Sequence, residues 1–351
     1  MAPIVGVSPA IVAGAVISGA YFGDKMTPLS ETTIMVPQLV GGLNVYQHVR
    51  AMLWTSLPAF LIALGIFGAI GLTRAVAETQ IQKDAALQAI EAVYNISWIN
   101  LLPLLLLLLF TIVKFSPFLS IFMSALFAGV LAAFTQPQVV QSVANDPSLS
   151  YPLAAIKAIY TAMATGHVSV SPYPALDELF SRGGMSSMLT TIWLILGALS
   201  FAAIMEYAGF LDRFITPLVG KAKSTGTLIL SVIGTGFGLN FIAGDQYVAV
   251  VLPSRMFRLE FKKRGLAPQV LSRAVEDSGT VTSVLIPWNT CGAYISGVLG
   301  VSTFAYVPYC FYNVFNPVIS VIYGFTGFKM ERLPPEGPAV ESGGAQPEAA
   351  G

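Results

Sequence analysis

Carboxylates stand within long apolar stretches of this chain, and their placement restricts its fold more than any other feature. One polar segment covers residues 23–33, a second covers residues 238–247, and a third begins with the Glu-Asp pair of residues 276–280. A carboxylate is costly at bilayer depth and persists there mainly where it faces a water-filled path or binds an ion. We therefore expect a membrane transporter whose ligand is a cation.

The composition predicts an all-α polytopic membrane protein. Charged residues make up only 10% of the chain, apolar residues make up 55%, and the mean hydropathy is +0.72. A soluble domain has about 25% charged residues. The formal net charge is zero, which gives no reason to expect a nucleic acid or another partner that needs a basic surface.

Neither an enzyme nor a resident metal centre is expected. Cys291 and Cys310 fall in apolar stretches and are predicted to be small buried side chains rather than a disulfide or a metal pair. His48 and His167 fall in predicted connecting segments and cannot form a convincing metal site. No Ser/His or metal-ligand constellation lies at membrane depth, so no cofactor is predicted beyond the transported ions.

Apolar segments of about 20 residues are long enough to span a bilayer as helices. Six are uninterrupted and two are broken, which gives about seven to eight membrane segments in residues 1–332. The uninterrupted segments are 3–20, 50–72, 96–113, 116–135, 187–207 and 302–324. The broken ones are 226–252, with several glycines and Asp245, and 279–300, with Pro287. Such breaks are tolerated at membrane depth only where protein or a cavity satisfies the freed backbone groups, so they indicate a binding site.

The connecting segments predict the topology. Residues 73–95 are expected to form an amphipathic interfacial helix, and residues 137–186 a long linker. Residues 254–277 contain six basic residues, which the positive-inside rule places in the cytoplasm. Basic residues in 208–225 put both flanks of 226–252 on one side, which favours a re-entrant hairpin over a simple span.

The first polar segment supplies four candidate ligands. They are Asp24, Ser30, Glu31 and Thr32. Pro28 breaks the helix between the first and the others, and a broken helix frees carbonyl groups. Together with hydroxyls and carboxylates, these carbonyls can form the oxygen shell of a hard cation such as Na⁺. The alternative is an interfacial loop in which Asp24 caps a helix and pairs with Lys25.

The second polar segment contains Asp245, which lies between a glycine-rich run and the apolar residues 248–252 and is expected within membrane depth. The alternative is a satisfied buried Asp at a helix N-terminus. That alternative is compatible with function, because half-helix termini are part of such sites. Asn240 and Gln246 are neutral oxygen donors nearby, and a ligand role and a structural role stay equally open for each.

The third polar segment contains the adjacent carboxylates Glu276 and Asp277, followed by Ser278. We consider all three candidates for the ion path, and the alternative is a helix start whose dipole favours two acidic residues. Further along, Asn289 and Thr290 follow Pro-Trp in mid-segment. They are candidates too, with hydrogen bonding between helices as the alternative.

Carboxylates can provide the exchange chemistry themselves. Burial raises the proton affinity of a carboxylate, and a nearby cation lowers it. One carboxylate can therefore bind either H⁺ or Na⁺, but not both well. Competition at one site is a sufficient physical basis for exchange, which makes four residues the strongest candidates: Asp24, Glu31, Asp245 and Asp277.

In these polar segments the chain resembles the NhaC family of Na⁺/H⁺ antiporters. The match rests on residues 17–30, on 239–247, and on 276–280 continuing through 287–294, and it covers nearly the whole chain. The resemblance implies the ion-transporter architecture, with inverted repeats and discontinuous helices that meet at mid-membrane. It also implies that nine residues lie near the ion path: Asp24, Ser30, Glu31, Thr32, Asn240, Asp245, Asp277, Asn289 and Thr290.

Two departures from the family pattern matter. Glu31 stands where the family usually has Asp, which keeps the charge but adds a methylene, so ion affinity or ion choice can shift. The family also has several spans ahead of the first polar segment, including a broken element, and these are missing here. The first repeat, residues 1–72, is therefore expected to be incomplete relative to the second, about 187–325, and the chain to be a truncated reading frame or a fragment.

The resemblance implies exchange of Na⁺ or Li⁺ for H⁺ across the cytoplasmic membrane of a prokaryote, with homo-oligomerisation left open. The family also includes malate and lactate exchangers coupled to Na⁺ or H⁺, so organic-acid antiport is one alternative and an inactive fragment is another. An anionic substrate would need a fixed cation. Lys25 is the only cation inside a polar segment, which favours a cation-only site. The tail, residues 333–351, is expected to be disordered and cytoplasmic.

Overall fold

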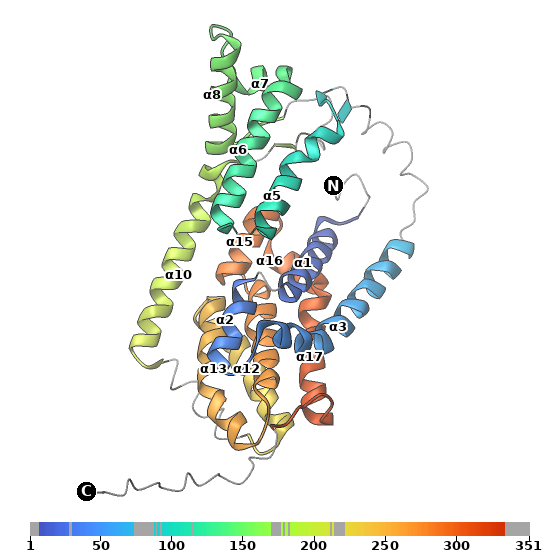
Figure 1. Ribbon diagram of the computed structural model, residues 1–351, viewed down its shortest axis with the longest axis vertical. Helices are drawn as coiled ribbons and strands as arrows, with labels where there is room; N and C mark the ends of the chain where they lie inside the picture. The colour runs from blue at the N-terminus through green and yellow to red at the C-terminus, as the bar shows by residue number, and fades with distance from the viewer. Residues whose placement is uncertain are drawn as a thin grey trace, which may run out of the picture. The chain divides into compact units, whose positions relative to one another are not determined.

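The structure is a computed structural model, and it is all-α in the part that it describes (Figure 1). The described residues are 7–27, 30–73, 88, 90–91, 93–113, 115–169, 177, 180–181, 183–210, 213 and 222–333. No β-strand occurs in these ranges. The predicted fold class is confirmed in this respect.

Figure 1 traces the described α-helices from the N-terminus in blue to the C-terminal end in red. They are α1 Pro9–Met26, α2 Glu31–Val40, α3 Val45–Thr73, α5 Leu102–Ile112, α6 Pro117–Thr135, α7 Pro137–Ala144, α8 Tyr151–Ala164, α10 Leu189–Tyr207, α12 Thr225–Ile242, α13 Gln246–Lys263, α14 Pro268–Val275, α15 Thr290–Leu299, α16 Thr303–Tyr306 and α17 Phe311–Thr326. Short 3₁₀ turns cover Trp98–Leu101, Met185–Met188, Ser283–Leu285 and Val307–Tyr309. A π-helical turn, Glu276–Thr280, continues α14.

Four described helices are long and apolar enough to cross a membrane. These spans are Val45–Thr73, Phe118–Thr135, Met185–Met205 and Thr225–Ile242. A fifth is possible if the bent pair Thr290–Leu299 and Thr303–Tyr309, with 87° between its helices, counts as one span. The predicted spans 50–72, 116–135 and 187–207 are thereby confirmed as helices of spanning length.

The predicted interruptions are also confirmed. The segment 226–252 breaks between α12 and α13, where Gly244 has the positive φ of 67° that favours glycine. The segment 279–300 changes from the π-helical turn to a 3₁₀ turn and resumes as a helix only at Thr290. Whether the α12–α13 pair is re-entrant in a bilayer stays a prediction, since α12 alone has the length of a span.

Two expectations about single segments are wrong. The span 302–324 is not one helix, because it divides at the Val307–Tyr309 turn, where Pro308 has no N–H group to continue the ladder. The linker 137–186 contains α7 and α8, which both begin with a proline in the first two positions, where the missing N–H costs nothing. Most of the predicted helix 73–95 and the tail from 334 lie outside the described residues.

The chain divides into two compact units. Unit 1 comprises Met1–Ser18, Ala63–Phe201 and Val284–Phe311, and unit 2 comprises Gly19–Ile62, Ala202–Ser283 and Tyr312–Gly351. In unit 1, α5 packs on α6 and α7 packs on α8. The α7–α8 contact is made by small apolar side chains, among them Ala144 and Ala158.

Unit 2 is built around α12 and α13, which pack side by side, with α2 and α14 against α13 (Figure 1). Its core consists of branched aliphatic and phenylalanine side chains, including Val36, Leu228, Val232 and Phe257. The π-helical turn packs against both α12 and α13. Contact with α13 is close because position 279 is glycine: a Cβ there would lie 2.6 Å from the carbonyl oxygen of Ala249.

Candidate ion-binding site

The π-helical turn brings the third polar segment into the interior of unit 2. All five of its residues, Glu276 to Thr280, are buried. The two carboxylates follow the C-terminal end of α14, so the alternative of a helix start, favoured by the helix dipole, is wrong for them. Extra residues of this kind in a helical turn occur frequently at functional sites, because they leave backbone groups outside the regular ladder.

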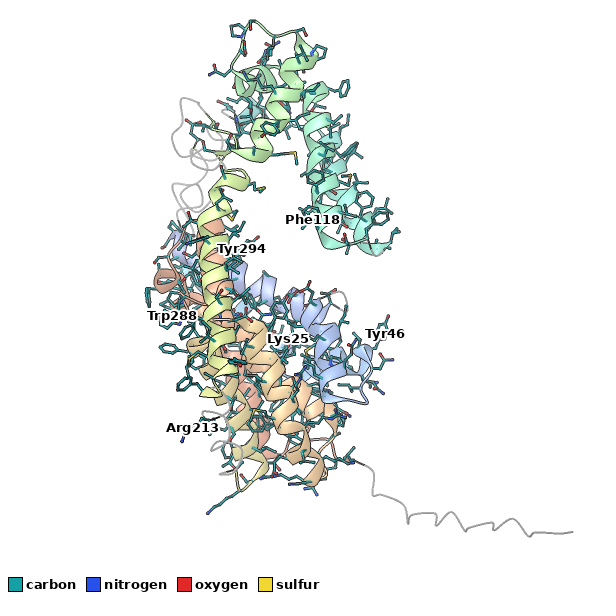
Figure 2. The ribbon with its side chains drawn as sticks, turned by 90° about the vertical axis from the view of Figure 1, so that its left-hand side faces the viewer. Lys25, Tyr46, Phe118, Arg213, Trp288 and Tyr294 are labelled. Atoms are coloured by element: carbon teal, nitrogen blue, oxygen red, sulfur yellow. The ribbon has the colours of Figure 1, made fainter. Side chains whose placement is uncertain are left out.

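Asp277 forms a buried ion pair with Lys25, which lies in the last turn of α1. Neither side chain has any exposed surface, and Figure 2 marks Lys25 among the helices of unit 2. The Nζ atom of Lys25 also donates to Oδ1 of Asn316 at 3.0 Å. The Oγ1 atom of Thr55 donates to Oδ1 of Asp277 at 3.0 Å.

The pair of Lys25 and Asp277 is electrically neutral, but one carboxylate oxygen of Asp277 accepts no hydrogen bond. Burying two charges is favourable only when geometry is good and further hydrogen bonds satisfy the remaining polar atoms. Oδ2 of Asp277 has no hydrogen-bond partner within the described residues. Oδ1 of Asn316 and Oγ1 of Thr55 lie against the same pair. Two oxygen atoms, from Asp277 and Asn316, therefore hold the ammonium group, and the hydroxyl of Thr55 lies on the same carboxylate.

Glu276, the neighbour of Asp277, faces a different partner. Its Oε1 atom lies 3.8 Å from Nε2 of His48, and both side chains are fully buried. Neither carboxylate oxygen of Glu276 has a described partner at normal hydrogen-bond geometry, although the side chains of His48 and Thr280 both interact with this carboxylate. On the other side of the imidazole ring, Nδ1 of His48 lies 2.9 Å from Oγ of Ser272. The expectation that His48 sits in a connecting segment is wrong, because it lies in the first turn of α3.

The first polar segment lies at the junction of α1 and α2. The hydroxyl of Ser30 donates to Oδ2 of Asp24 at 3.1 Å and lies 3.4 Å from Oγ1 of Thr32. Asp24 is exposed, whereas Ser30 and Thr32 are buried. Glu31 begins α2, is exposed, and accepts a hydrogen bond from the hydroxyl of Tyr247. Three of the four candidates are thus joined in one small cluster, and Glu31 is bound separately.

The second polar segment contributes mainly to packing contacts. Asn240, fully buried in α12, donates to the carbonyl of Gly279 at 2.7 Å and to Oγ1 of Thr282 at 3.0 Å. Ser278 uses its hydroxyl within its own helix, donating to the carbonyl of Ala274 at 2.9 Å. The hydrogen bonds of Asn240 thereby fix the π-helical turn against α12.

Asp245 is the N-cap of α13. Its Oδ1 atom accepts from the backbone N–H of Val248 at 3.1 Å, and the side chain is buried. This is the alternative considered for Asp245, a satisfied Asp at a half-helix start. An N-cap uses one oxygen for the backbone, and negative charge is stabilised there by the helix dipole.

Asn289 and Thr290 belong to unit 1. Asn289 is the N-cap of α15, with its Oδ1 atom 3.0 Å from the backbone N of Cys291, and Thr290 is the first residue of that helix. Their location in unit 1 leaves their proximity to the carboxylates of unit 2 a prediction. The roles of the other candidate residues in ion binding stay predictions.

Sequence reasoning missed several polar contacts of the two buried carboxylates. His48, Thr55 and Asn316 were not among the predicted site residues, although all three are fully buried. Thr55 and Ser56 interrupt the apolar run of α3, and Asn316 precedes Pro317 inside α17. A polar side chain beside a proline in a span was the available signal.

The described residues contain no group of three or more His, Cys, Asp or Glu side chains that could hold a metal ion. A site for a transported monovalent cation needs fewer charges, since hydroxyl and amide oxygens can complete the shell. The oxygen atoms around Lys25 and Asp277 are of these kinds.

The chain is similar in sequence to known proteins. The sequence model of the Na⁺/H⁺ antiporter family matches residues 19–328. The chain is 32% identical to the Na⁺/H⁺ antiporter NhaC of Alkalihalophilus pseudofirmus over 92% of its own length and 66% of that protein, and 30% identical to NhaC of Bacillus subtilis over 89% and 66%. It is also 30% identical to the malate-2H⁺/Na⁺-lactate antiporter of Bacillus subtilis, over 92% and 65%. The chain thus spans about two thirds of the length of the curated relatives it matches. No solved structure matches it.

Proposed function

The chain belongs to the Na⁺/H⁺ antiporter family, and on that premise we propose that it is a multi-pass transporter that exchanges Na⁺ for H⁺ across the cytoplasmic membrane. One observation carries the proposal: a fully buried carboxylate, Asp277, holds an ammonium group together with the amide oxygen of Asn316 and keeps one oxygen unpaired. A buried carboxylate of this kind is expensive in a membrane protein and indicates an ion path.

The ammonium group of Lys25 stands in for the transported cation. Its contacts, a carboxylate oxygen of Asp277 and the amide oxygen of Asn316, are those that a Na⁺ ion at the same place would need. When the site is empty, Lys25 neutralises Asp277 and prevents an uncompensated buried charge. When Na⁺ enters, it competes with the ammonium group for Asp277, so that binding of the ion separates the pair.

The first polar segment supplies the access route in this proposal. Asp24 is exposed, and it is joined through Ser30 to the buried Thr32. A carboxylate at the surface attracts cations, and a hydroxyl behind it offers the next oxygen ligand. Because Lys25 follows Asp24 directly in α1, an ion at Asp24 lies one residue along the helix from the partner of Asp277.

Organic-acid exchange is the second candidate, since one relative is named as a malate and lactate antiporter. Such a substrate would need a free cation for its carboxylate. Lys25 is fully buried and paired with Asp277, which favours a site for cations alone. Na⁺ exchange that stays intact in K25Q would favour the cation site, whereas loss of malate- or lactate-driven exchange in K25Q would favour the organic-acid site.

The location of the chain within the cell forms part of the same proposal. The last turn of α13 contains Lys262 and Lys263, and the next residue is Arg264. The positive-inside rule puts this end on the cytoplasmic side, together with the residues after α17. The oligomeric state is left to measurement.

The decisive experiment measures Na⁺-driven dissipation of a pH gradient in everted vesicles that contain this chain. D277N removes the charge that binds the cation and is expected to abolish the response, whereas D245N keeps a good helix cap and tests Asp245 separately. Malate and lactate are tested as alternative drivers. Suppose that the inserted protein gives no response to Na⁺ but does respond to malate or lactate. This result would refute cation exchange and favour organic-acid exchange.

A further inference from the structure

The buried imidazole of His48 has a hydrogen-bonding problem that one additional proton solves. Ser272 has a single hydroxyl hydrogen, and its Oγ lies 3.1 Å from the carbonyl oxygen of Gln269, to which it can only donate. The same Oγ lies 2.9 Å from Nδ1 of His48. Both contacts are hydrogen bonds at once only if Nδ1 of His48 carries a proton and donates to Ser272.

A proton on Nδ1 also determines the role of the other ring nitrogen, Nε2. In a neutral imidazole one nitrogen is a donor and the other an acceptor, so Nε2 of His48 then presents a lone pair. It faces Oε1 of Glu276 at 3.8 Å, and neither that nitrogen nor either oxygen of Glu276 has a hydrogen-bond partner among the described residues. Two buried acceptors facing each other without a proton are unfavourable, because each loses its hydration and gains nothing.

We propose that His48 and Glu276 hold the exchanged proton between them, at a site distinct from the Na⁺ site at Asp277. A proton on Nε2 of His48 converts the two facing acceptors into a charge-assisted hydrogen bond, which is stronger than one between neutral groups. A shift of the side chains by less than about 1 Å brings the two atoms within normal hydrogen-bond distance. The proposal rests on the exchange function proposed above and assigns its proton to named atoms.

The charged groups around this pair are arranged for coupling to the cation. Lys25 and Asp24 of α1 interact electrostatically with Glu276, and Asp277 follows it in the same turn. Arg273 of α14 interacts with Asp277 and donates to the carbonyl of Lys329 at 3.2 Å. Glu31 of α2 interacts with Asp24, and Tyr312 of α17 interacts with Asp277, Glu276 and Asp24.

Charges in the protein interior are screened less than those at a surface. A Na⁺ ion at Asp277 adds positive charge beside the turn that carries Glu276 and weakens the hold on the proton of His48. Conversely, the proton opposes the arrival of Na⁺. Two neighbouring sites of this kind exchange their ions by repulsion and need no shared ligand.

The chain contains only two histidines, which makes a direct test possible. His167 lies in unit 1, where its Nε2 atom is 3.3 Å from the hydroxyl of Tyr94, so H167Q leaves His48 as the sole imidazole. Nitrogen-15 NMR of purified H167Q in nanodiscs reports which ring nitrogens carry protons. We expect the neutral ring to carry its proton on Nδ1, and both nitrogens to be protonated when the pair is loaded. A neutral ring with its proton on Nε2 overturns the proposal.

Removal of the Glu276 carboxylate provides a second test of the proposal. In E276Q, made in the H167Q background, the new amide can donate to Nε2 of His48, so no proton is expected on that nitrogen under the conditions that load the pair in H167Q. A ring that charges in E276Q as it does in H167Q shows that Glu276 does not hold the proton, and this refutes the pair.

The third arm counts protons released when Na⁺ is added to the purified protein, read with a pH indicator. H167Q is the control, and H48Q is expected to release about one proton fewer per Na⁺ bound, since proton release counts the change in bound protons. H48N, whose amide can still donate to Ser272 in place of Nδ1, guards against misfolding and should show the same loss. Equal release by H48Q, H48N and H167Q refutes the role of His48 alone. No release by H167Q itself refutes the exchange and with it the proton site.

Discussion

The buried pair of Lys25 and Asp277 gives the sharpest prediction about stability. In K25M the methionine keeps a similar volume, but the ammonium group is gone, and the charge of Asp277 is left buried without a counter-charge. Removing one partner of a fully buried pair costs about 3–5 kcal/mol. Both side chains here have no exposed surface, so solvent screening does not reduce that figure.

A loss of this size is a large share of the stability of a typical domain, which is about 5–15 kcal/mol. We therefore expect K25M to unfold at clearly lower SDS fractions than the parent in mixed micelles. Na⁺ should restore much of the loss, because the ion replaces the ammonium group, and its effect on K25M should exceed its effect on the parent. K⁺ at equal ionic strength is the control for general screening.

The double variant K25M/D277N tests the physical reasoning itself. It removes both charges, so its loss of unfolding free energy should be smaller than the sum of the two single losses, with a coupling of about 0.5–3 kcal/mol. K157M is the matched control, because Lys157 pairs with Asp146 at 3.1 Å with 43% and 33% of the side-chain surfaces exposed. An exposed pair is worth about 0–1 kcal/mol. Additive losses for Lys25 and Asp277, within about 0.5 kcal/mol, would show that the two groups do not form a pair.

Three further predictions follow from single contacts. D245A should destabilise the protein by about 1 kcal/mol through the lost helix cap, whereas D245N, which keeps a capping oxygen, should melt close to the parent; equal melting of D245A and D245N would contradict the cap. G279A should cost about 1–3 kcal/mol, because its Cβ would lie 2.6 Å from the carbonyl oxygen of Ala249, and an unchanged melting temperature would show that the turn is not tightly packed there. The hydrogen bond from Ser148 lowers the pKa of Asp146 below its ordinary value of 3.8, so the stabilisation it provides is present above that pH and is lost as the pH falls through the lowered pKa; melting temperatures of the parent and D146N, measured from neutral to acid pH, should therefore converge at the acid end.

The helices of spanning length could be predicted from the sequence because they depend on local properties. A run of about 20 apolar residues satisfies its own backbone only as a helix at bilayer depth. The break before Asp245 was equally local, since Gly244 adopts a positive φ that glycine tolerates and Asp is a good N-cap. Prolines were the weak point: Pro137 begins a helix where the sequence predicted a linker, and Pro308 divides a predicted span.

The pairs within the site could not be predicted in the same way. Lys25 and Asp277 are 252 positions apart, and His48 and Ser272 are 224 apart. A buried polar residue inside an apolar helix has no sequence pattern that names its partner. Thr55, for example, looks like any threonine of a span until Asp277 is placed beside it. The sequence could mark the carboxylates as costly, but only the packing of unit 2 shows what compensates each of them.

The π-helical turn explains why two adjacent carboxylates need not share one task. Consecutive side chains on an α-helix point about 100° apart around its axis, and those of a π-helical turn also diverge, so neighbours in sequence face different surroundings. Asp277 faces Lys25 and Thr55 and is neutralised by a fixed charge, whereas Glu276 faces His48 across a gap without hydrogen bonds. In the proposed scheme a cation displaces the first partner, and a proton bridges the second gap. Because one turn carries both groups, binding at either carboxylate changes the electrostatic potential at the other over a distance of a single residue.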